Sequence, residues 1–311
     1  MFLKLAFAEL HRFPRLKKLA LYFDVRYHPA VPFDSSGYPS YNVVCEIGNS
    51  HQWDVLRAIG KNKNHLPELQ SFEIYGWHCS DKFSTLFDET PITGLISSLR
   101  HLHFSLPLVR PDDSISREML WNQVVMRRLL QPAVNLESLK ITRSQICDNK
   151  QHFDISQFDA SQFAIYPRLT VLTLWGIAWE DGKAGQGGII MPPPLEDFIM
   201  CHKMTLKKLD MYNCSINVGE RSRPPNCYWA DIYKRLSGAL TELVEVAVGS
   251  HFSPYKSESP YVYLVGDTYR PVEILEETER MEGMGRDRLA LKEFKEIVKK
   301  RRTGGGSGFQ S

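Results

Sequence analysis

The chain has 311 residues, of which 43% are hydrophobic and 24% charged, so it can bury a large core and is long enough for two domains or one extended repeat array. Its 38 basic and 36 acidic residues leave a net charge of +2, which argues against a generally basic surface for nucleic acid. No apolar run approaches the roughly 18 residues of a membrane span, and Glu9 interrupts the apolar start, which makes it a poor signal peptide. We therefore expect neither nucleic acid nor a membrane among its partners.

One pattern recurs along the chain: a leucine at position 1, followed by apolar residues at positions 4 and 6. Successive copies begin 53, 30, 37, 33, 37 and 37 residues apart, and the seventh copy is the weakest. The long first gap holds a stretch rich in Pro, Ser and Gly at 31–39, which is typical of an inserted loop. Seven copies at this spacing indicate a repeat protein. The copies begin at Leu16, Leu69, Leu99, Leu136, Leu169, Leu206 and Leu243.

Each copy predicts one strand, because apolar positions 4 and 6 alternate with polar neighbours, while position 1 lies in the preceding turn and points inward. Helical spacing of apolar residues predicts helices over 52–59, 119–130, 192–199 and 228–236. Strand, loop and helix repeating every 30 to 37 residues predict an α/β right-handed solenoid, a horseshoe with parallel strands on its concave face and helices on its convex face. We expect about seven irregular repeats over residues 1–250.

Residues 251–303 depart from the repeat. Here we expect a strand at 261–265 that extends the sheet, an acidic, loosely ordered stretch over 271–285, and a helix over 286–302. That helix would cover the last repeat's core, and its basic end at 299–302 is interpreted as a solvated helix end rather than an anion-binding patch. We expect residues 304–311 to form a flexible Gly/Ser tail. The apolar face of the expected helix carries Ala290, Leu291, Phe294, Ile297 and Val298.

The six cysteines are too sparse for a disulfide scaffold, and no two of them have C-x-x-C spacing. Reduced, buried thiols are expected, which favours the cytoplasm or the nucleus as the protein's location.

The L-x-x-L-x-L pattern resembles the leucine-rich repeat, and Cys214 stands at position 9, where that family carries Asn or Cys. The spacing, the proline-containing lead-ins before Leu16, Leu69 and Leu169, and an acidic-then-basic C-terminal helix resemble the leucine-rich region of fungal F-box proteins. The resemblance covers roughly residues 10–250, and the F-box itself is not visible. It implies a substrate receptor of a cullin-RING ubiquitin ligase, whose adaptor is a partner only if an F-box precedes this chain.

Motifs for catalysis or cofactors are weak. The glycine-rich stretch 182–188 has neither phosphate-binding pattern and is interpreted as an inserted loop. His101 and His103 share one strand face and could be joined by His78 and Cys79 in a zinc site, but a structural histidine pair is the favoured interpretation. There is no G-x-S-x-G elbow and no H-E-x-x-H. We expect no enzyme activity, no cofactor and no metal.

The concave face supplies the candidate site, because positions 3, 5 and 7 point away from the leucine core. Position 7 carries four aromatic residues beside mixed charges at positions 3 and 5, a composition enriched in protein-binding surfaces. The alternative is that these aromatics pack under loops or under a C-terminal segment. The candidate partner-binding residues are Tyr22, Glu73, Tyr75, His101, His103, Lys140, Trp175, Lys208, Asp210 and Tyr212.

The function predicted from the sequence is a non-catalytic protein–protein interaction module with an unknown protein target. Two other hypotheses stay open. One is a hydrolase or transferase on a repeat scaffold, with His101, His103 and Asp210 near its centre. The other is a truncated gene product without retained activity.

Overall fold

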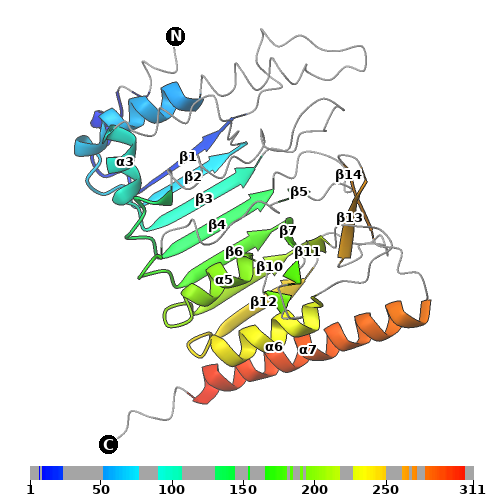
Figure 1. Ribbon diagram of the computed structural model, residues 1–311. Coiled ribbons are helices and arrows are strands. Elements are labelled where there is room, and N and C mark those ends of the chain that lie inside the picture. Colours follow the sequence, from blue (N-terminus) through cyan, green and yellow to red (C-terminus); the bar gives the residue numbers. More distant parts are fainter. Residues whose placement is uncertain are drawn as a thin grey trace, which may run out of the picture. The chain divides into compact units, whose positions relative to one another are not determined.

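The computed structural model describes residues 7, 9–23, 52–76, 90–106, 130–143, 153–154, 165–180, 183–184, 190–191, 194–217, 227–249, 261–265, 268–271 and 277–304. A seven-stranded parallel sheet with accompanying helices makes this an α/β protein (Figure 1). The seven predicted strands are confirmed, and each includes positions 3 to 7 of its repeat. In sheet order they are β1 (Lys18–Tyr22), β2 (Ser71–Tyr75), β3 (His101–Leu106), β4 (Ser138–Arg143), β6 (Val171–Trp175), β10 (Lys208–Tyr212) and β12 (Glu245–Gly249).

Within β1 to β4, and within β6, β10 and β12, neighbouring strands pair without any offset between repeats. Lys18 of β1 lies opposite Ser71 of β2, which in turn lies opposite His101 of β3, all at position 3. The turn before the strand repeats too, since the Lys17 carbonyl accepts the backbone N–H groups of Gln70 and Ser71 at 3.0 and 3.1 Å. Equal positions therefore form straight columns within each unit, and the leucines of its repeats lie on one side of the strands.

The leucine side is the core. In the second to sixth repeats, every residue at positions 1, 4 and 6 is at most 2% exposed, as is Leu243 at position 1 of the seventh. The end repeats are less buried: Leu19 in the first and Val246 and Val248 in the last are half-buried. Terminal repeats have a neighbour on one side only, so they bury less apolar surface until another element covers them.

A left-handed residue ends three of the strands at position 8. These are Gly76 (φ 71°), Gly176 (φ 69°) and Asn213 (φ 51°). Glycine adopts this conformation without a Cβ penalty, and Asn tolerates it better than other residues. At two of these turns the position-8 N–H donates to the position-7 carbonyl of the next repeat, at 2.9 Å for Gly176 and 3.0 Å for Asn213. The turn thus continues the ladder one residue past the strand.

The chain divides into two compact units, Met1–Asp148 with Tyr166–Arg168, and Asn149–Ile165 with Leu169–Ser311. The first unit contains β1 to β4. Its helix predicted over 52–59 is confirmed and extends to residue 61, while 119–129 of the next predicted helix lie outside the described residues and Leu130 is helical. Its described residues also form the 3-10 helices η1 (Glu9–Arg12) and η3 (Lys63–His65) and the α-helix α3 (Thr90–Ser97).

The second unit contains α5 (Pro194–Cys201) and α6 (Trp229–Ala239), which confirm the helices predicted there. It also contains a second sheet that the sequence did not predict, in the order β14-β13-β11-β7-β5. The strand at 261–265 belongs to this second sheet, so the expectation that it extends the main sheet is wrong. The remaining strands are β5 (Phe153–Asp154), β7 (Ile177–Glu180), β8 (Lys183–Ala184), β9 (Ile190–Met191), β11 (Ser215–Asn217), β13 (Tyr261–Val265) and β14 (Thr268–Pro271).

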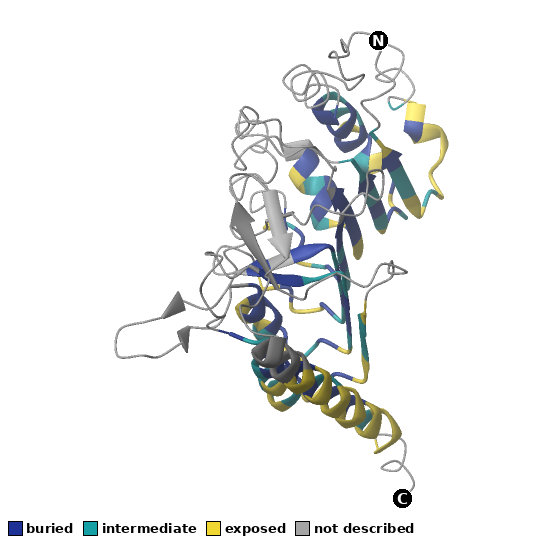
Figure 2. Ribbon diagram, turned by 90° about the vertical axis from the view of Figure 1, so that its right-hand side faces the viewer, coloured by how far each residue is buried: buried dark blue, intermediate teal, exposed yellow. Residues whose placement is uncertain are grey.

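The C-terminal helix α7 (Glu277–Gly304) is longer than expected. Residues 277–285, expected to be loosely ordered, are helical, and Gly304 is the helix's last residue rather than part of the tail. Ala290, Phe294 and Val298 are at most 4% exposed, whereas the opposite face of α7 is exposed (Figure 2). None of the helices in the described ranges has the length and apolar content needed to cross a bilayer.

Polar contacts fix α7 against α6 and the last strand. The Asp287 carboxylate accepts the Ala230 N–H (2.8 Å) near the start of α6, and Arg301 donates to the carbonyls of Leu240 (2.7 Å) and Ser237 (2.6 Å) at its end. The backbone groups at helix ends lack intrahelical partners, so these side chains satisfy groups that α6 cannot. The Lys295 ammonium donates to the Val248 carbonyl of β12 (3.2 Å). These contacts place α7 against α6 and the edge strand β12.

Candidate functional site

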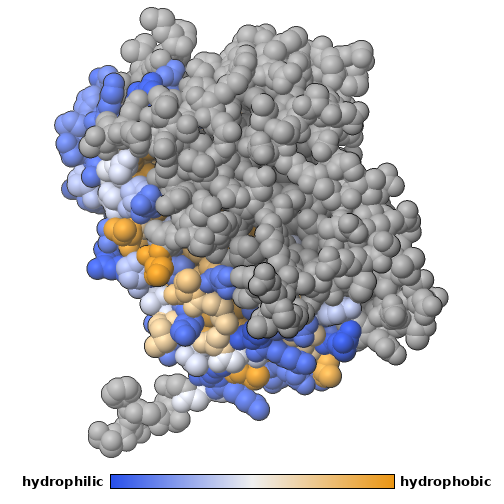
Figure 3. Space-filling model, in the orientation of Figure 1, coloured by the Kyte–Doolittle hydropathy of each residue, from blue (hydrophilic) through white to orange (hydrophobic). Residues whose placement is uncertain are grey.

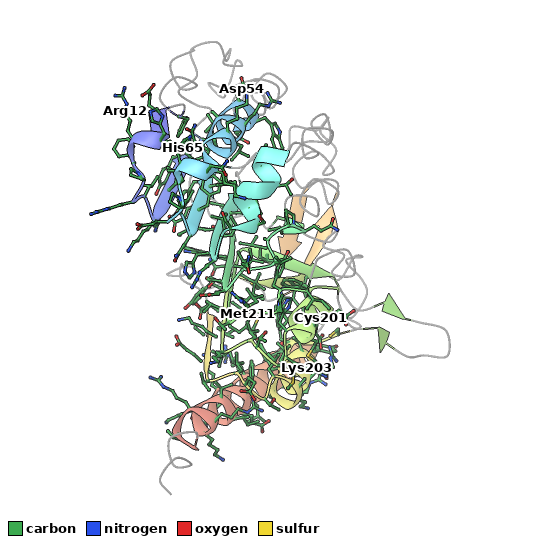
Figure 4. All side chains as sticks on the ribbon, turned by 90° about the vertical axis from the view of Figure 1, so that its left-hand side faces the viewer. Arg12, Asp54, His65, Cys201, Lys203 and Met211 are labelled. Carbon is green, nitrogen blue, oxygen red and sulfur yellow. The ribbon has the colours of Figure 1, made fainter. Side chains whose placement is uncertain are left out.

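The candidate residues occupy the side of the strands opposite the leucines, because successive side chains of a strand point to opposite faces. The drawn side chains extend from the strands to both sides, and Met211, at position 6 of β10, is buried in the interior (Figure 4). Cys201 and Lys203, at the end of α5, are exposed. The side chains at positions 3, 5 and 7 form the polar strand face.

Two tyrosines form the aromatic part of this face in the first unit. Tyr22 of β1 and Tyr75 of β2 are opposite each other at position 7, and their rings stack with centroids 4.3 Å apart and an interplanar angle of 1°. Tyr22 is 72% exposed, so one face of a large aromatic side chain is presented to solvent with its other face supported. Supported and exposed tyrosines are common anchors in protein interfaces, since they offer large contact area at little conformational cost.

A charged pair lies beside the stack at positions 3 and 5. The Lys18 ammonium lies 2.8 Å from one carboxylate oxygen of Glu73, and the Tyr75 hydroxyl donates to the other at 3.1 Å. Burial raises the pKa of Glu73, but the Lys18 and Tyr75 hydrogen bonds outweigh it, so the pKa lies below its usual value. Burial and the Glu73 charge together raise the pKa of the Tyr75 phenol. The carboxylate therefore stays charged and the phenol neutral at physiological pH.

His103 extends the network to β3 and β4. Its ring packs edge-on against Tyr75 with centroids 4.8 Å apart, and its Nε2 lies 2.8 Å from the Thr142 hydroxyl. His103 is only 6% exposed, and burial, together with the positive charges of Lys140 and Lys18, lowers its pKa to about 4 against the opposing effect of Glu73. A neutral imidazole is thus built into this face. Of the other candidates on these strands, His101 is exposed and Lys140 half-buried.

The polar strand face of the second unit centres on Asp210. One Asp210 oxygen accepts from the Thr173 hydroxyl at 3.3 Å and lies 3.6 Å from the Lys208 ammonium, which also pairs with Glu245. The other oxygen, Oδ1, is buried and has no hydrogen-bond partner. Asp210 is 8% exposed, and burial raises its pKa in spite of Lys208 and Thr173.

Two more aromatic candidates flank this cluster. Trp175 and Tyr212 lie opposite each other at position 7 of β6 and β10, and both are half-buried. Position 7 is therefore aromatic at two adjacent strands in each unit, as the sequence columns predicted.

Sequence reasoning missed the pairing partners. Lys18, Thr142, Thr173 and Glu245 complete the networks around Glu73, His103, Asp210 and Lys208, although none of the four was among the candidate residues. For Lys18 and Glu245 the available signal was opposite charge on the neighbouring repeat, whereas no charge pattern marks Thr142 or Thr173. Such a charge pattern predicts a pair only when the register of the strands is known, and the register comes from the structure.

The chemistry available at this face is limited. His103 and Thr142 have the spacing of a base and a nucleophile, but both side chains are buried, and the Thr142 hydroxyl also donates to the Phe104 carbonyl at 3.5 Å. In the described ranges no three His, Cys, Asp or Glu side chains come together in a way that could hold a metal ion. His78 and Cys79 of the imagined zinc site lie outside those ranges.

Cys214, the position-9 residue of its repeat, bridges two strand ends. Its thiol lies 3.7 Å from the Leu174 carbonyl of β6 and 3.6 Å from the Tyr212 carbonyl of β10. Burial raises the pKa of this thiol to about 12, although hydrogen bonds with Ile177, Trp179 and Tyr212 oppose the effect. Cys214 therefore acts as a neutral, structural thiol that satisfies backbone carbonyls between repeats.

No protein-family model matches the chain, and the search among curated proteins finds no match.

Proposed function

We propose that this chain is a non-catalytic protein-binding module, built as a right-handed solenoid of the leucine-rich-repeat type. Three observations support the solenoid: strands of successive repeats pair in register, the position-1 leucines of all but the first repeat are fully buried, and Cys214 contacts carbonyls of two repeats. In such a solenoid the polar strand face is concave, and a curved face of parallel strands suits an extended protein surface.

The observation that carries the proposal is the supported tyrosine stack. Tyr22 is 72% exposed, and one face of its ring stacks on the ring of Tyr75. The Tyr75 hydroxyl is in turn held by the Glu73 carboxylate, which is paired with Lys18. A rigid aromatic side chain surrounded by satisfied charges has the properties of an interface hot spot, because little conformational entropy remains to be lost on binding.

The resemblance to fungal F-box proteins suggests the biological role. In this proposal the polar strand face selects a protein for ubiquitination, and the ligase adaptor binds through an F-box supplied upstream. The cytoplasm or the nucleus fits this role. Cys201 and Cys214 are thiols rather than disulfides, as expected in a reducing compartment.

Comparative affinity purification tests the proposal. Tyr22→Ala and Trp175→Ala together remove aromatic surface from the polar strand face, while Phe13→Ser and Met204→Ser remove the 59% and 69% exposed apolar side chains that lie elsewhere. Losing a hot spot weakens binding by about 2 kcal/mol, or about 30-fold, so quantitative mass spectrometry should find specific partners depleted only from the first variant. A partner set that is unchanged in that variant would refute a role for this face.

A further inference from the structure

A stripe of exposed basic side chains runs along one flank of α7, beside the buried face that carries Ala290, Phe294 and Val298. Between residues 286 and 302 the helix carries eight basic and three acidic residues. Five of the basic side chains lie along one line of the helix, and all five are exposed. The middle one, Lys295, also donates a hydrogen bond from its ammonium to the Val248 carbonyl. The basic stripe consists of Arg288, Lys292, Lys295, Lys299 and Arg302.

The spacing makes the stripe straight. Its members are separated by four, three, four and three residues, so they recur every 3.5 residues on average and stay on one helical face over about 21 Å. A 3.5-residue repeat is the period that keeps one face of a helix in contact with a second helix along a left-handed supercoil. Of the acidic residues of this segment, Asp287 is buried and Glu293 lies away from the stripe. Glu296 lies beside the stripe, four residues after Lys292 and three before Lys299, but forms no ion pair of 4 Å or less with either.

The charges of the stripe are not neutralised. Within the described ranges no carboxylate forms an ion pair with Arg288, Lys292, Lys299 or Arg302. The space-filling view shows a largely hydrophilic surface over the described part of α7 (Figure 3). The helix is also held rigid, because Phe294 packs against Tyr233 (ring centroids 6.1 Å apart) and Asp287 and Arg301 are bonded to the two ends of α6. The cations are thus preorganised, which lowers the entropic cost of binding an anionic partner.

We propose that the basic stripe is a docking site for an acidic helical segment of a partner protein, with carboxylates spaced to match. The stripe's period fits a second helix, and charges flanking a helix seam are known to select partner and orientation. Two other polyanions fit less well. A membrane-surface helix inserts its apolar face into lipid, whereas Ala290, Phe294 and Val298 are buried within the protein. Nucleic-acid binders are more strongly basic overall than this chain, whose net charge is +2.

Synthetic peptides test this site on the full chain. One peptide carries glutamates at i, i+4, i+7, i+11 and i+14 of a helix, and a second has the same composition with the glutamates rearranged. The stripe variant is Arg288→Gln with Lys292→Gln and Lys299→Gln. A control variant removes the same charge from exposed lysines outside the stripe. It combines Lys203→Gln, Lys234→Gln and Lys300→Gln.

Fluorescence anisotropy at about 0.15 M salt should give at least about tenfold tighter binding for the matched peptide than for the rearranged one. The stripe variant should lose about tenfold in affinity, since three exposed ion pairs of about 0.5 kcal/mol each are removed, and the control should change less than about twofold. Equal binding of the two peptides, equal loss in both variants, or no binding at about 1 mM peptide would overturn the proposal. So would tighter, stripe-dependent binding of duplex DNA or of phosphatidylserine vesicles, which would assign the stripe to another class of partner.

Discussion

Acidification should destabilise the first unit through His103. The pKa of this buried imidazole is lowered from 6.5 to about 4, chiefly by burial and then by Lys140. Between these two pH values His103 is protonated in the unfolded chain but neutral in the folded protein. The free energy of unfolding therefore rises with pH in this window, and stability present above pH 6.5 is lost as the pH falls toward 4.

The two pKa values set the size of the effect. At pH 7.5 the histidine is neutral in both the folded and the unfolded state, so its protonation contributes almost nothing to the free energy of unfolding. At pH 5 the unfolded chain holds the proton almost fully while the folded protein is still mostly neutral, which corresponds to about 2 kcal/mol of lost stability. His103 is 6% exposed, so solvent screening leaves most of this amount in place.

Urea unfolding at pH 7.5, 6 and 5 measures the effect, with His103→Gln and His101→Gln compared to the parent. His101 lies two residues away on the same strand and is exposed, so its replacement controls for changes elsewhere on the strand. His103→Gln cannot take up the proton, and its stability deficit relative to the parent should shrink by about 2 kcal/mol between pH 7.5 and 5. A deficit that stays constant with pH would show that His103 is not the group responsible.

Three further substitutions test the packing that positions the site. Gly76→Ala should lower stability by at least about 2 kcal/mol, because an added Cβ at φ +71° would lie 2.2 Å from a backbone oxygen. Arg235→Gln should cost about 3 kcal/mol by leaving the 1% exposed Glu196 carboxylate unpaired, and adding Glu196→Gln should recover part of this loss. Phe294→Ala should cost about 3 to 5 kcal/mol and increase hydrogen exchange in α7. Thermal unfolding measures all three.

The chain offers controls for these substitutions. Gly238→Ala meets no atom within 4 Å in α6 and should be neutral or slightly stabilising. Leu289→Ala, on a side chain 59% exposed, should change stability by less than about 0.5 kcal/mol. Equal effects of Gly76→Ala and Gly238→Ala, or of Phe294→Ala and Leu289→Ala, would contradict the packing described for α7 and for the strand ends.

The sequence by itself determined the strands of the main sheet. Position 4 and position 6 residues such as Phe72 and Ile74 alternate with polar neighbours, and that period of two is a local property that needs no knowledge of the fold. The helices at 52–61, α5 and α6 were predictable for the same reason, since their apolar residues recur at helical intervals. The aromatic column at position 7, from Tyr22 to Tyr212, followed from counting along each repeat.

The tertiary structure alone decided how these elements combine. Of the second sheet the sequence predicted only the strand at 261–265, and its other strands have two to four residues, too few for a recognisable alternation. Pairing without an offset brings Lys18 to Glu73 and Thr142 to His103, across 39 to 55 residues of sequence. Burial of His103 and Asp210 likewise depends on what packs around them. The periodicity of apolar side chains depends only on residues that are neighbours in the sequence. Strand register, burial and pKa depend on contacts between residues that are far apart in the sequence.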